Sequence, residues 1–578
     1  MEETFFYGGN KVNIEQSKAA VRDAVIAALG SDELTKEQVM GLIEVPKKAA
    51  MGDYAFPTFQ LAKTLHKSPV VIAQDTVKNI NDSAFNKVEA KGPYINFSLK
   101  REDLSQSTIS EILDKGANYG DSNEGKKANI TIDMSSPNIA KPMSMGHLRS
   151  TVIGNSIAKV LSKLDYQPIK INYLGDWGTQ FGKLMVAYKK WGSEEAVRRD
   201  PITNLQKYYV KFHQEDKKDP ELDDEAREWF RKLETGDEEA TYLWKWFRSA
   251  SLKAFQKVYD QLGVEFDSHK GESFYNDKMD EVVQMLEDKH LLKESQGAQI
   301  VDLGDTLPPA MIKKSDAATL YLTRDLAAAI YRKRTYNFKK SLYVVGSEQS
   351  VHFDQLKAVL KLLGFGWYKD IEHIKFGLIT SGGKKLSTRN GRVILLEKVL
   401  KDSVKLAQEQ IEEKNPTLNN KDQVAHDVGV GAVIFHDLKN NRVDNFDFKL
   451  EDVVRFEGET GPYVQYSHAR AMSILRKADY KAQDAAINPE TIDDNTWSII
   501  KLLADFPVAV EQSGAEREPS VIAKYALKLA KAFNHYYAHT KVLVEDDQLQ
   551  VRLNIVNSIA TILKESLDLL GVKAPDEM

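Results

Sequence analysis

The chain contains no cysteine among its 578 residues, which excludes disulfide bonds, thiol nucleophiles and thiolate-bound metals. Its 12 histidines show no His-Glu-x-x-His pairing or similar ligand spacing, so we expect no structural metal. No segment approaches the roughly 18 uninterrupted apolar residues of a membrane span, and the first residues lack the basic-then-apolar order of a signal peptide. These absences predict a soluble, cytoplasmic protein.

The chain also lacks an excess of positive charge. A net charge of −5 and a pI near 6.2 argue against a generally basic nucleic-acid coat, although a local basic groove can still act over about 8 Å. The hydrophobic fraction of 42% is enough for several cores. At about 150 residues per domain, the length predicts roughly three or four domains.

The sequence pattern divides the chain into four parts. Residues 1–115 mix helical patterns with the alternating "GPYINFSL", which predicts a small α+β domain. Residues 116–400 alternate strand-like and helix-like segments, typical of an α/β domain with a parallel sheet, and a charge-dense helical insertion interrupts them at about 195–290. A connecting helical region follows at 401–449, and an all-α bundle is predicted over 450–578.

The segment "SSPNIAKPMSMGHLRS", residues 135–150, lies between the strand-like "ANITIDMS" and a helical run. Gly146 and His147 therefore stand where the carboxyl end of a strand meets the start of a helix, a position that favours anionic ligands. Lys141 and Ser144 add a charge and a hydroxyl suited to phosphate. By itself the pattern is weak, because a Gly-His pair is expected about once by chance in a chain of this composition.

A second segment, "SGGKKLSTRNGR", spans residues 381–392 and combines glycines, hydroxyls and four cations. It is typical of a loop that grips phosphates. A solvated basic turn explains the same composition equally well when the segment is taken alone.

Together, the Met-Gly-His and Lys-Leu-Ser-Thr sequences resemble the His-Ile-Gly-His and Lys-Met-Ser-Lys-Ser signatures of class I aminoacyl-tRNA synthetases. The resemblance is strongest to the arginyl-tRNA synthetases, whose Ser-Pro-Asn-x-Ala-Lys-Pro and His-Leu-Arg-Ser sequences stand here at 136–142 and 147–150. Further similar stretches are "NYLGDWGTQFG" (172–182), "GESFY" (271–275), "YLTRD" (321–325), "GSEQSVHFDQL" (346–356), "GPYVQYSHAR" (461–470) and the ending "LLGVKAPDEM". The resemblance covers nearly the full chain.

The resemblance implies a Rossmann-type catalytic domain, an N-terminal domain that reads the tRNA D-loop, and a DALR-type anticodon-binding bundle. It implies that ATP and L-arginine form an arginyl-adenylate, and that arginine is then transferred to the 2′-hydroxyl of the terminal adenosine of tRNA(Arg). Mg²⁺ is expected with ATP, no cofactor is expected to be permanently bound, and tRNA is expected to be needed before activation. The family default is a monomer without DNA or membrane partners.

The resemblance also implies an arginine pocket. Its candidate residues are Glu272, Tyr321 and Asp325 for the guanidinium, Asn138 and Gln349 for the α-amino and carboxylate end, with Ser136 nearby and Asp133 as a further candidate. Carboxylates in a fixed fork would select a planar guanidinium over lysine. Without the resemblance, Tyr321 and Asp325 could form a helix-surface hydrogen bond, and Asn138 could be a turn residue.

For the reaction itself, the resemblance implies His147, Lys141, Ser144 and Lys385 as catalytic residues. ATP-binding candidates are Gly146, His147, Ser144, Lys385, Ser387, Thr388 and Arg389. Two positions depart from the family pattern, since Ser144 replaces the first His of one signature and Thr388 the second Lys of the other. We expect Lys141 to compensate for the missing lysine.

For tRNA, the candidates are Tyr463, Tyr466, Tyr536, Tyr537 and Met578 at the anticodon loop, and Asn96 in the N-terminal domain. Aromatic rings suit unstacked bases, but a buried core ring is the alternative for each tyrosine. Two other functions remain as alternatives. One is another nucleotidylyl-transferring enzyme, which has no need for a DALR-like bundle; the other is an inactive tRNA-binding paralogue, which would be free to lose His147 and Asp325.

Overall fold

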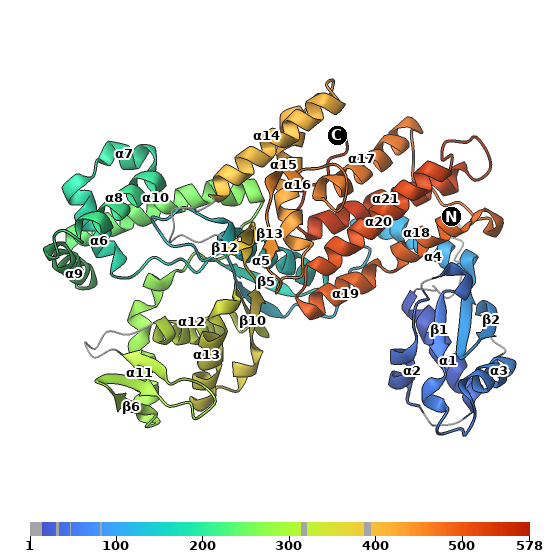
Figure 1. The fold of residues 1–578 in the computed structure, drawn as a ribbon, viewed down its shortest axis with the longest axis horizontal. Helices are drawn as coiled ribbons and strands as arrows, with labels where there is room; N and C mark the ends of the chain where they lie inside the picture. Colours follow the sequence, from blue (N-terminus) through green and yellow to red (C-terminus); the bar gives the residue numbers. More distant parts are fainter. Residues whose placement is uncertain (1–13, 31–33, 47, 81–83, 314–320, 386–394) are drawn as a thin grey trace, which may run out of the picture.

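The computed structural model of the chain describes residues 14–30, 34–46, 48–80, 84–313, 321–385 and 395–578. Figure 1 shows a blue N-terminal domain, a central α/β domain with a helical insertion, and an orange-to-red helical bundle. This multidomain arrangement confirms the predicted fold class. No helix of the described residues has the length and apolar character needed to cross a membrane.

The N-terminal domain is built on an antiparallel sheet of strand order β1-β3-β2. Its elements are β1 (Tyr54–Pro57), β2 (Phe85–Lys91), β3 (Tyr94–Leu99), α1 (Ile14–Leu29), α2 (Lys36–Leu42) and α3 (Pro69–Asn79). Gly92 turns the chain between β2 and β3 with a φ of +61°, which favours glycine. Ser68 caps α3 by accepting from the Val71 N–H, and Pro69 occupies the first turn.

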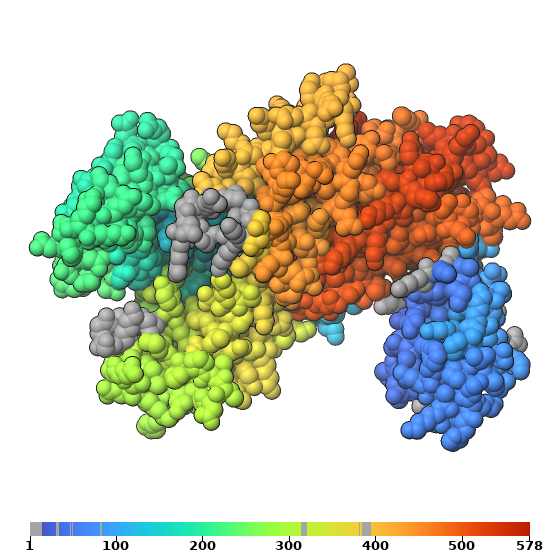
Figure 2. Space-filling view, viewed as in Figure 1, coloured from blue at the N-terminus to red at the C-terminus, as the bar shows by residue number. Residues whose placement is uncertain are grey.

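The N-terminal domain meets the bundle through a small polar contact. Asp53, 8% exposed, accepts from the Trp497 indole at 2.8 Å and pairs with Lys501 at 2.9 Å. Beside it, helix α4 (Arg101–Lys115) packs on α18 and α21 of the bundle. Figure 2 shows open space between the blue domain and the yellow-green part of the α/β domain. The N-terminal domain is thus attached to the bundle and stands apart from that part of the α/β domain.

The α/β domain contains a parallel sheet of order β10-β9-β4-β5. The strands are β4 (Asn129–Asp133), β5 (Gln167–Ile171), β9 (Lys340–Gly346) and β10 (Ile371–Phe376), and the helices that connect or cover them include α5 (Met145–Lys163), α12 (Tyr321–Tyr336) and α13 (Ser350–Leu362). All four strands point the same way, so the loops after their carboxyl ends gather at one edge of the sheet. The first signature segment, Glu272 and Gln349 follow β4, β5 and β9 along the chain, whereas Tyr321 and Asp325 come from α12, which precedes β9.

A long connection between β5 and β9 carries the insertion. Its helices are α6 (Gln180–Trp191), α7 (Glu194–Arg199), α8 (Pro201–Glu215), α9 (Glu221–Glu234), α10 (Glu238–Leu262) and α11 (Met279–Asp288). It also holds an antiparallel sheet that the sequence analysis did not predict, formed by β6 (Leu292–Ser295), β7 (Ala298–Val301) and β8 (Ala310–Lys313). Gln296 and Gly297 turn its first hairpin with φ of +52° and +77°, as a two-residue turn of this kind requires.

Helices and short strands join the α/β domain to the bundle. They are β11 (Ile379–Ser381), β12 (Lys384–Lys385), α14 (Leu396–Lys414), α15 (Lys421–Leu438), β13 (Phe446–Asp447) and α16 (Leu450–Val453). The bundle comprises α17 (Gly461–Lys477), α18 (Asp494–Ala504), α19 (Phe506–Glu516), α20 (Ser520–His539) and α21 (Leu549–Leu569). Short 3-10 helices lie at η1 (Ala49–Met51), η2 (Phe59–Leu61), η3 (Gly116–Asn118), η4 (Glu272–Lys278), η5 (Ser347–Gln349), η6 (Gly366–Asp370) and η8 (Pro489–Thr491).

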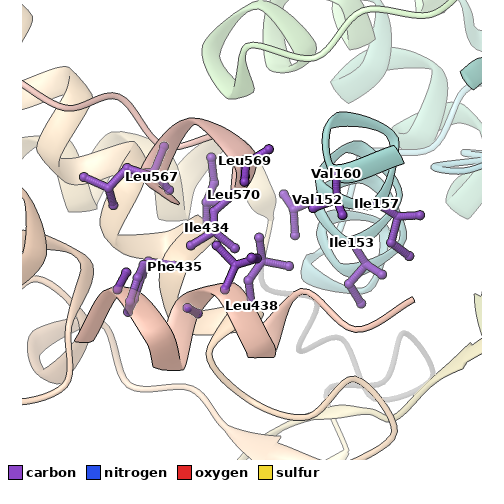
Figure 3. Close-up of a cluster of buried hydrophobic side chains, with 14 of the residues drawn as sticks. Val152, Ile153, Ile157, Val160, Ile434, Phe435, Leu438, Leu567, Leu569 and Leu570 are labelled. Carbon is purple, nitrogen blue, oxygen red and sulfur yellow. The ribbon is translucent and has the colours of Figure 1, made fainter. Parts of the chain in front are cut away.

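Helix α5 is the meeting point of the domains. Figure 3 shows its Val152, Ile153, Ile157 and Val160 beside Ile434, Phe435 and Leu438 of α15 and Leu567, Leu569 and Leu570 at the end of α21. The buried Ser156 hydroxyl donates to the Leu569 carbonyl at 2.8 Å. The helix that begins at the first signature is therefore packed directly against the bundle.

A buried arginine on the same helix makes the connection polar as well. Arg149, 1% exposed, pairs with Asp437 of α15 at 3.3 Å. The same guanidinium donates to the carbonyls of Gly377 at 2.8 Å and Asp444 at 3.1 Å. These carbonyls precede β11 and β13, which pair with each other in parallel. Arg149 thus joins α5 to the strands from which the second signature extends.

Candidate functional site

His147 lies in the first turn of α5, half-buried, beside the helix cap. The Ser144 N–H donates to its Nδ1 at 3.0 Å, so Nδ1 is the unprotonated nitrogen. Burial, opposed by this hydrogen bond and reinforced by the charge of Lys141, lowers the pKa of His147 to about 4. The ring is therefore neutral at pH 7 and carries its proton on Nε2, where it can donate to a ligand oxygen.

The loop between β4 and α5 contains an unusual backbone. Ser135, Ser136 and Ala140 have φ of +76°, +50° and +62°, and each such residue typically costs about 1–3 kcal/mol. Side chains from other elements hold the loop in place: Ser150 Oγ accepts from the Ser135 N–H at 2.9 Å and Ser251 Oγ from the Ala140 N–H at 3.1 Å. Strain held in this way is common where a loop positions groups for a ligand.

Three candidates in or next to this loop have solvent-exposed positions. Asn138 is exposed, and its backbone bridges to Gly175 in parallel. A Cβ at Gly175 would lie 2.3 Å from Asn138 Oδ1, so a larger residue there would force the Asn138 side chain to turn away. Gly146 is also exposed, at the start of α5. Lys141 is exposed with its ammonium 5.6 Å from the ring centre of Tyr209 on α8, turned toward the insertion.

The described chain that follows the second signature segment lies beside the first segment. Leu395, three residues after the second segment, forms an isolated antiparallel bridge with Ser144, and the Leu396 N–H donates to the Met143 carbonyl at 3.0 Å. Lys385 is placed by its backbone in β12, which pairs with β11. The remaining candidates of this segment, Ser387, Thr388 and Arg389, lie outside the described residues.

Glu272 begins η4, and its backbone N–H donates to the Leu174 carbonyl at 2.9 Å. A Cβ on the preceding Gly271 would lie 2.6 Å from that carbonyl oxygen, so this close approach also needs glycine. Burial raises the pKa of Glu272 to about 7, although Arg324, 4.0 Å away, acts to lower it. A cationic ligand placed against this carboxyl group would favour its ionised form and would be attracted to it in turn.

Asp325 on α12 is the second carboxylate of this region. It accepts from the Tyr173 hydroxyl at 3.0 Å and contacts His352 Nε2 at 2.6 Å. Tyr321, one turn earlier on the same helix, is 64% exposed, and Gln349 is exposed at the end of η5. The structure thus places the two carboxylates among the guanidinium candidates, Glu272 and Asp325, beyond the carboxyl ends of the strands together with Gln349. The sequence analysis missed Tyr173 and His352 because only the folded chain brings them to Asp325.

The structure corrects the prediction for Asp133. Its carboxylate is 4% exposed and pairs with Arg332, itself 1% exposed, at 2.8 Å. The Ser136 hydroxyl donates to the same carboxylate at 3.1 Å. Burial raises the pKa of Asp133, while Arg332 and Ser136 act to lower it. The Asp133 carboxylate is therefore part of an internal ion pair and is not placed to contact a ligand directly, whereas Ser136, which is only partly buried, stays a candidate.

Comparison with known proteins identifies the chain. The family "tRNA synthetases class I (R), catalytic domain" matches residues 108–450, "DALR anticodon binding domain" matches 464–578, and "Arginyl tRNA synthetase N terminal domain" matches 15–99. Arginine–tRNA ligases of Lactiplantibacillus plantarum and Latilactobacillus sakei are each 64% identical, over 97% of this chain and 100% of theirs. The chain belongs to the arginyl-tRNA synthetase family.

A solved structure of Thermus thermophilus arginyl-tRNA synthetase agrees with this identification, with a TM-score of 0.79 and 26% identity over 97% of this chain and 100% of that one. The predicted function, ligation of arginine to tRNA, is confirmed, and ATP is a substrate.

In this arginyl-tRNA synthetase, an aromatic cluster marks the outer face of the bundle. Tyr466 on α17 is 36% exposed and Tyr537 on α20 is 46% exposed. The Arg470 guanidinium lies over both rings, 4.9 and 5.2 Å from their centres. Tyr463 is only half-buried and packs against the core. Tyr536 is 1% exposed, which fits the alternative that its ring belongs to the core. We therefore remove Tyr536 from the tRNA-binding candidates.

The last residues of the synthetase are docked. The Pro575 carbonyl lies 3.0 Å from His468 Nδ1 of α17, and the Asp576 carbonyl accepts from Arg476 at 3.0 Å. The Met578 carbonyl accepts from the Asn415 amide at 3.2 Å. The tail is therefore held along α17 and reaches α14, which places Met578 on the same bundle as the exposed tyrosines.

Asn96, the tRNA-binding candidate in the N-terminal domain, has a buried side chain. It lies in β3 between β1 and β2 and is 2% exposed. Neither atom of its side-chain amide has a hydrogen-bond partner among the residues that the structure describes. A buried amide without partners costs about 1–3 kcal/mol, so RNA could supply the missing bonds only after the covering side chains move.

Proposed function

We propose that Asp325 and Glu272 recognise the arginine guanidinium, and that this pocket sets the amino-acid specificity of the synthetase. The observation that carries the proposal is the pair of carboxylates beyond the sheet's carboxyl edge, one fixed by two donors and one with a raised pKa. Asn138, Gln349 and Tyr321 are exposed on the same side of the domain, where they are available to the rest of the amino acid.

We further propose that His147 assists the first chemical step. The arginine carboxylate attacks the α-phosphorus of ATP, pyrophosphate leaves, and arginyl-adenylate forms. The Nε2–H of the neutral His147 donates to an oxygen of that phosphorus as charge develops, the N-terminus of α5 adds its dipole, and Ser144 holds the ring through its N–H. The phosphates of ATP are bound by Lys141 and Lys385, together with Gly146, Ser387, Thr388 and Arg389.

In the second step, the 2′-hydroxyl of the terminal tRNA adenosine attacks the adenylate carbonyl, and AMP leaves. We propose that Mg²⁺ arrives with ATP and is held mainly by its phosphates, as is usual for this ion. The described residues contain no group of three or more His, Asp or Glu side chains arranged to hold a metal by themselves. A monomeric state, a cytoplasmic location and the domain boundaries at 115, 400 and 449 remain predictions.

For tRNA, we propose that Tyr466, Tyr537 and Arg470 form a stacking surface for anticodon bases. Each stacked base is worth about 1–3 kcal/mol, and Arg470 fixes both rings. Tyr463 and Met578 support the edges of this surface, and Asn96 stays a candidate for the D-loop. Tyr537→Ala should raise the KM for tRNA about fivefold or more and leave the KM for arginine unchanged.

The experiment that tests the pocket is Asp325→Asn, assayed by aminoacylation with saturating tRNA. A charge-assisted hydrogen bond becomes a neutral one, so the arginine KM should rise about tenfold to a hundredfold, corresponding to roughly 1.5–3 kcal/mol. The KM for ATP should stay within twofold. Asp354→Asn on α13 is the matched control, because Asp354 is exposed and outside the pocket. An arginine KM within twofold of wild type would remove Asp325 from the site.

A further inference from the structure

Both oxygens of Asp325 have hydrogen-bond donors before any ligand is bound. The Tyr173 hydroxyl donates to Oδ1 at 3.0 Å, and His352 Nε2 lies 2.6 Å from Oδ2. An ionised carboxylate only accepts, so Nε2 must carry the proton in this contact. The three residues come from the loop after β5, from α12 and from the start of α13, so the arrangement depends on the whole domain.

Two donors fix the rotation of the carboxylate. A carboxylate has about four lone-pair positions, two on each oxygen. Tyr173 and His352 take one on each oxygen, which leaves one on each for a ligand. Two parallel acceptor positions in one plane match the paired N–H groups of a guanidinium, whereas an ammonium group needs no such fork.

Ring packing holds the side chains of the two donors, Tyr173 and His352, in place. The Tyr173 ring packs edge-on against Tyr275, with centres 5.8 Å apart, and lies under the Arg332 guanidinium at 5.1 Å. Burial, together with the charges of Asp325 and Glu272, raises the pKa of Tyr173 far above its ordinary value, so the hydroxyl keeps its proton. The His352 ring packs edge-on against Phe353, with centres 5.5 Å apart, in the first turn of α13.

We propose that His352, together with Tyr173, is a positioning residue that orients Asp325 for bidentate recognition of guanidinium and so discriminates arginine from lysine. The inference rests on the proposed role of Asp325. His352 does not contact the substrate in this scheme; it acts through the orientation of the carboxylate. Loss of the His352 side chain should therefore weaken the binding of arginine, whose guanidinium needs both acceptor positions of Asp325. It should leave the binding of lysine, whose ammonium needs no such pair, unchanged.

The test uses the full-length synthetase with saturating ATP and tRNA. The variants are His352→Ala, His352→Gln and Tyr173→Phe, with Asp325→Asn as reference and Asp354→Ala as the matched control on α13. Glutamine keeps an N–H donor at a reach similar to that of Nε2. The measurements are kcat, the KM values for arginine and ATP, and the Ki of lysine as a competitor of arginine.

His352→Ala should raise the arginine KM about tenfold, with kcat, the ATP KM and the lysine Ki within twofold of wild type. His352→Gln should restore the arginine KM to within threefold, and Tyr173→Phe should raise it about threefold to tenfold. If His352→Ala does not fold, as judged by thermal melting, the Gln and Phe variants still decide the question: the inference stands if both give these values and falls if either departs from them.

Two further results would overturn the inference and leave the proposed pocket intact. One is an unchanged arginine KM in a folded His352→Ala variant while Asp325→Asn raises that KM. The other is a lysine Ki that rises in step with the arginine KM in His352→Ala. An unchanged arginine KM in Asp325→Asn would instead overturn the proposed pocket itself, and the positioning role with it.

Discussion

The raised pKa of Glu272 makes arginine use depend on pH near neutrality. Burial raises this pKa to about 7, so the free enzyme holds the acid largely neutral at pH 6 and largely ionised at pH 8. The cationic guanidinium is attracted only to the ionised form. Since kcat/KM reports the free enzyme, its value for arginine should fall about tenfold from pH 8 to pH 6 through this group alone.

The assay is aminoacylation with saturating ATP and tRNA at several pH values, on wild type, Glu272→Gln and the exposed control Glu287→Gln. The glutamine at 272 removes both the charge and the titration, so the arginine KM should rise about tenfold to a hundredfold, and the tenfold pH effect should disappear. His147, with a pKa of about 4, stays neutral across this range and adds nothing to it. Superimposable pH profiles for wild type and Glu272→Gln would refute the reasoning.

Three further predictions concern other parts of the chain. His147→Ala should lower kcat about a hundredfold to a thousandfold with little change in the arginine KM, because a hydrogen-bond donor to the transition state is lost. An unchanged kcat in stopped-flow or steady-state kinetics would show that His147 does not have this role. Arg149→Met should lower the free energy of unfolding by about 3–5 kcal/mol, because Asp437 is left buried and unpaired, and the added change Asp437→Leu should recover much of it in urea unfolding. Deletion of 576–578 should raise the KM for tRNA at fixed salt and spare those for ATP and arginine; equal tRNA KM values would show that the docked tail serves stability alone.

The sequence predicted the elements whose signals are local. Alternation of Ile130 and Ile132 indicated β4, and both side chains are fully buried in the sheet. In the sequence, Ile522 and Phe533 fall on one apolar stripe typical of a helix, and both are also fully buried in α20. The last helix ends at Leu569, and Gly571 follows with a φ of +73°, as a glycine stop predicts.

What the sequence did not predict depends on contacts between distant segments. The pairs Arg149–Asp437 and Asp325–His352 join residues that no periodicity connects. The sheet β6-β7-β8 was missed because its strands have only four residues each, and β6 is mostly exposed and polar, so neither alternation nor an apolar run was visible. Asp133 and Tyr536 matched the expected residue types, but burial decided their roles and burial is set by the fold.

If Asp325 and Glu272 together hold the arginine side chain, a crystal structure of the synthetase with bound arginine will show it. We expect guanidinium nitrogens about 2.7–2.9 Å from both oxygens of Asp325, with Glu272 on the other side of the guanidinium and the contacts from Tyr173 and His352 retained. A guanidinium that pairs with neither carboxylate, in a crystal whose arginine is fully occupied, would show that the side chain is recognised elsewhere.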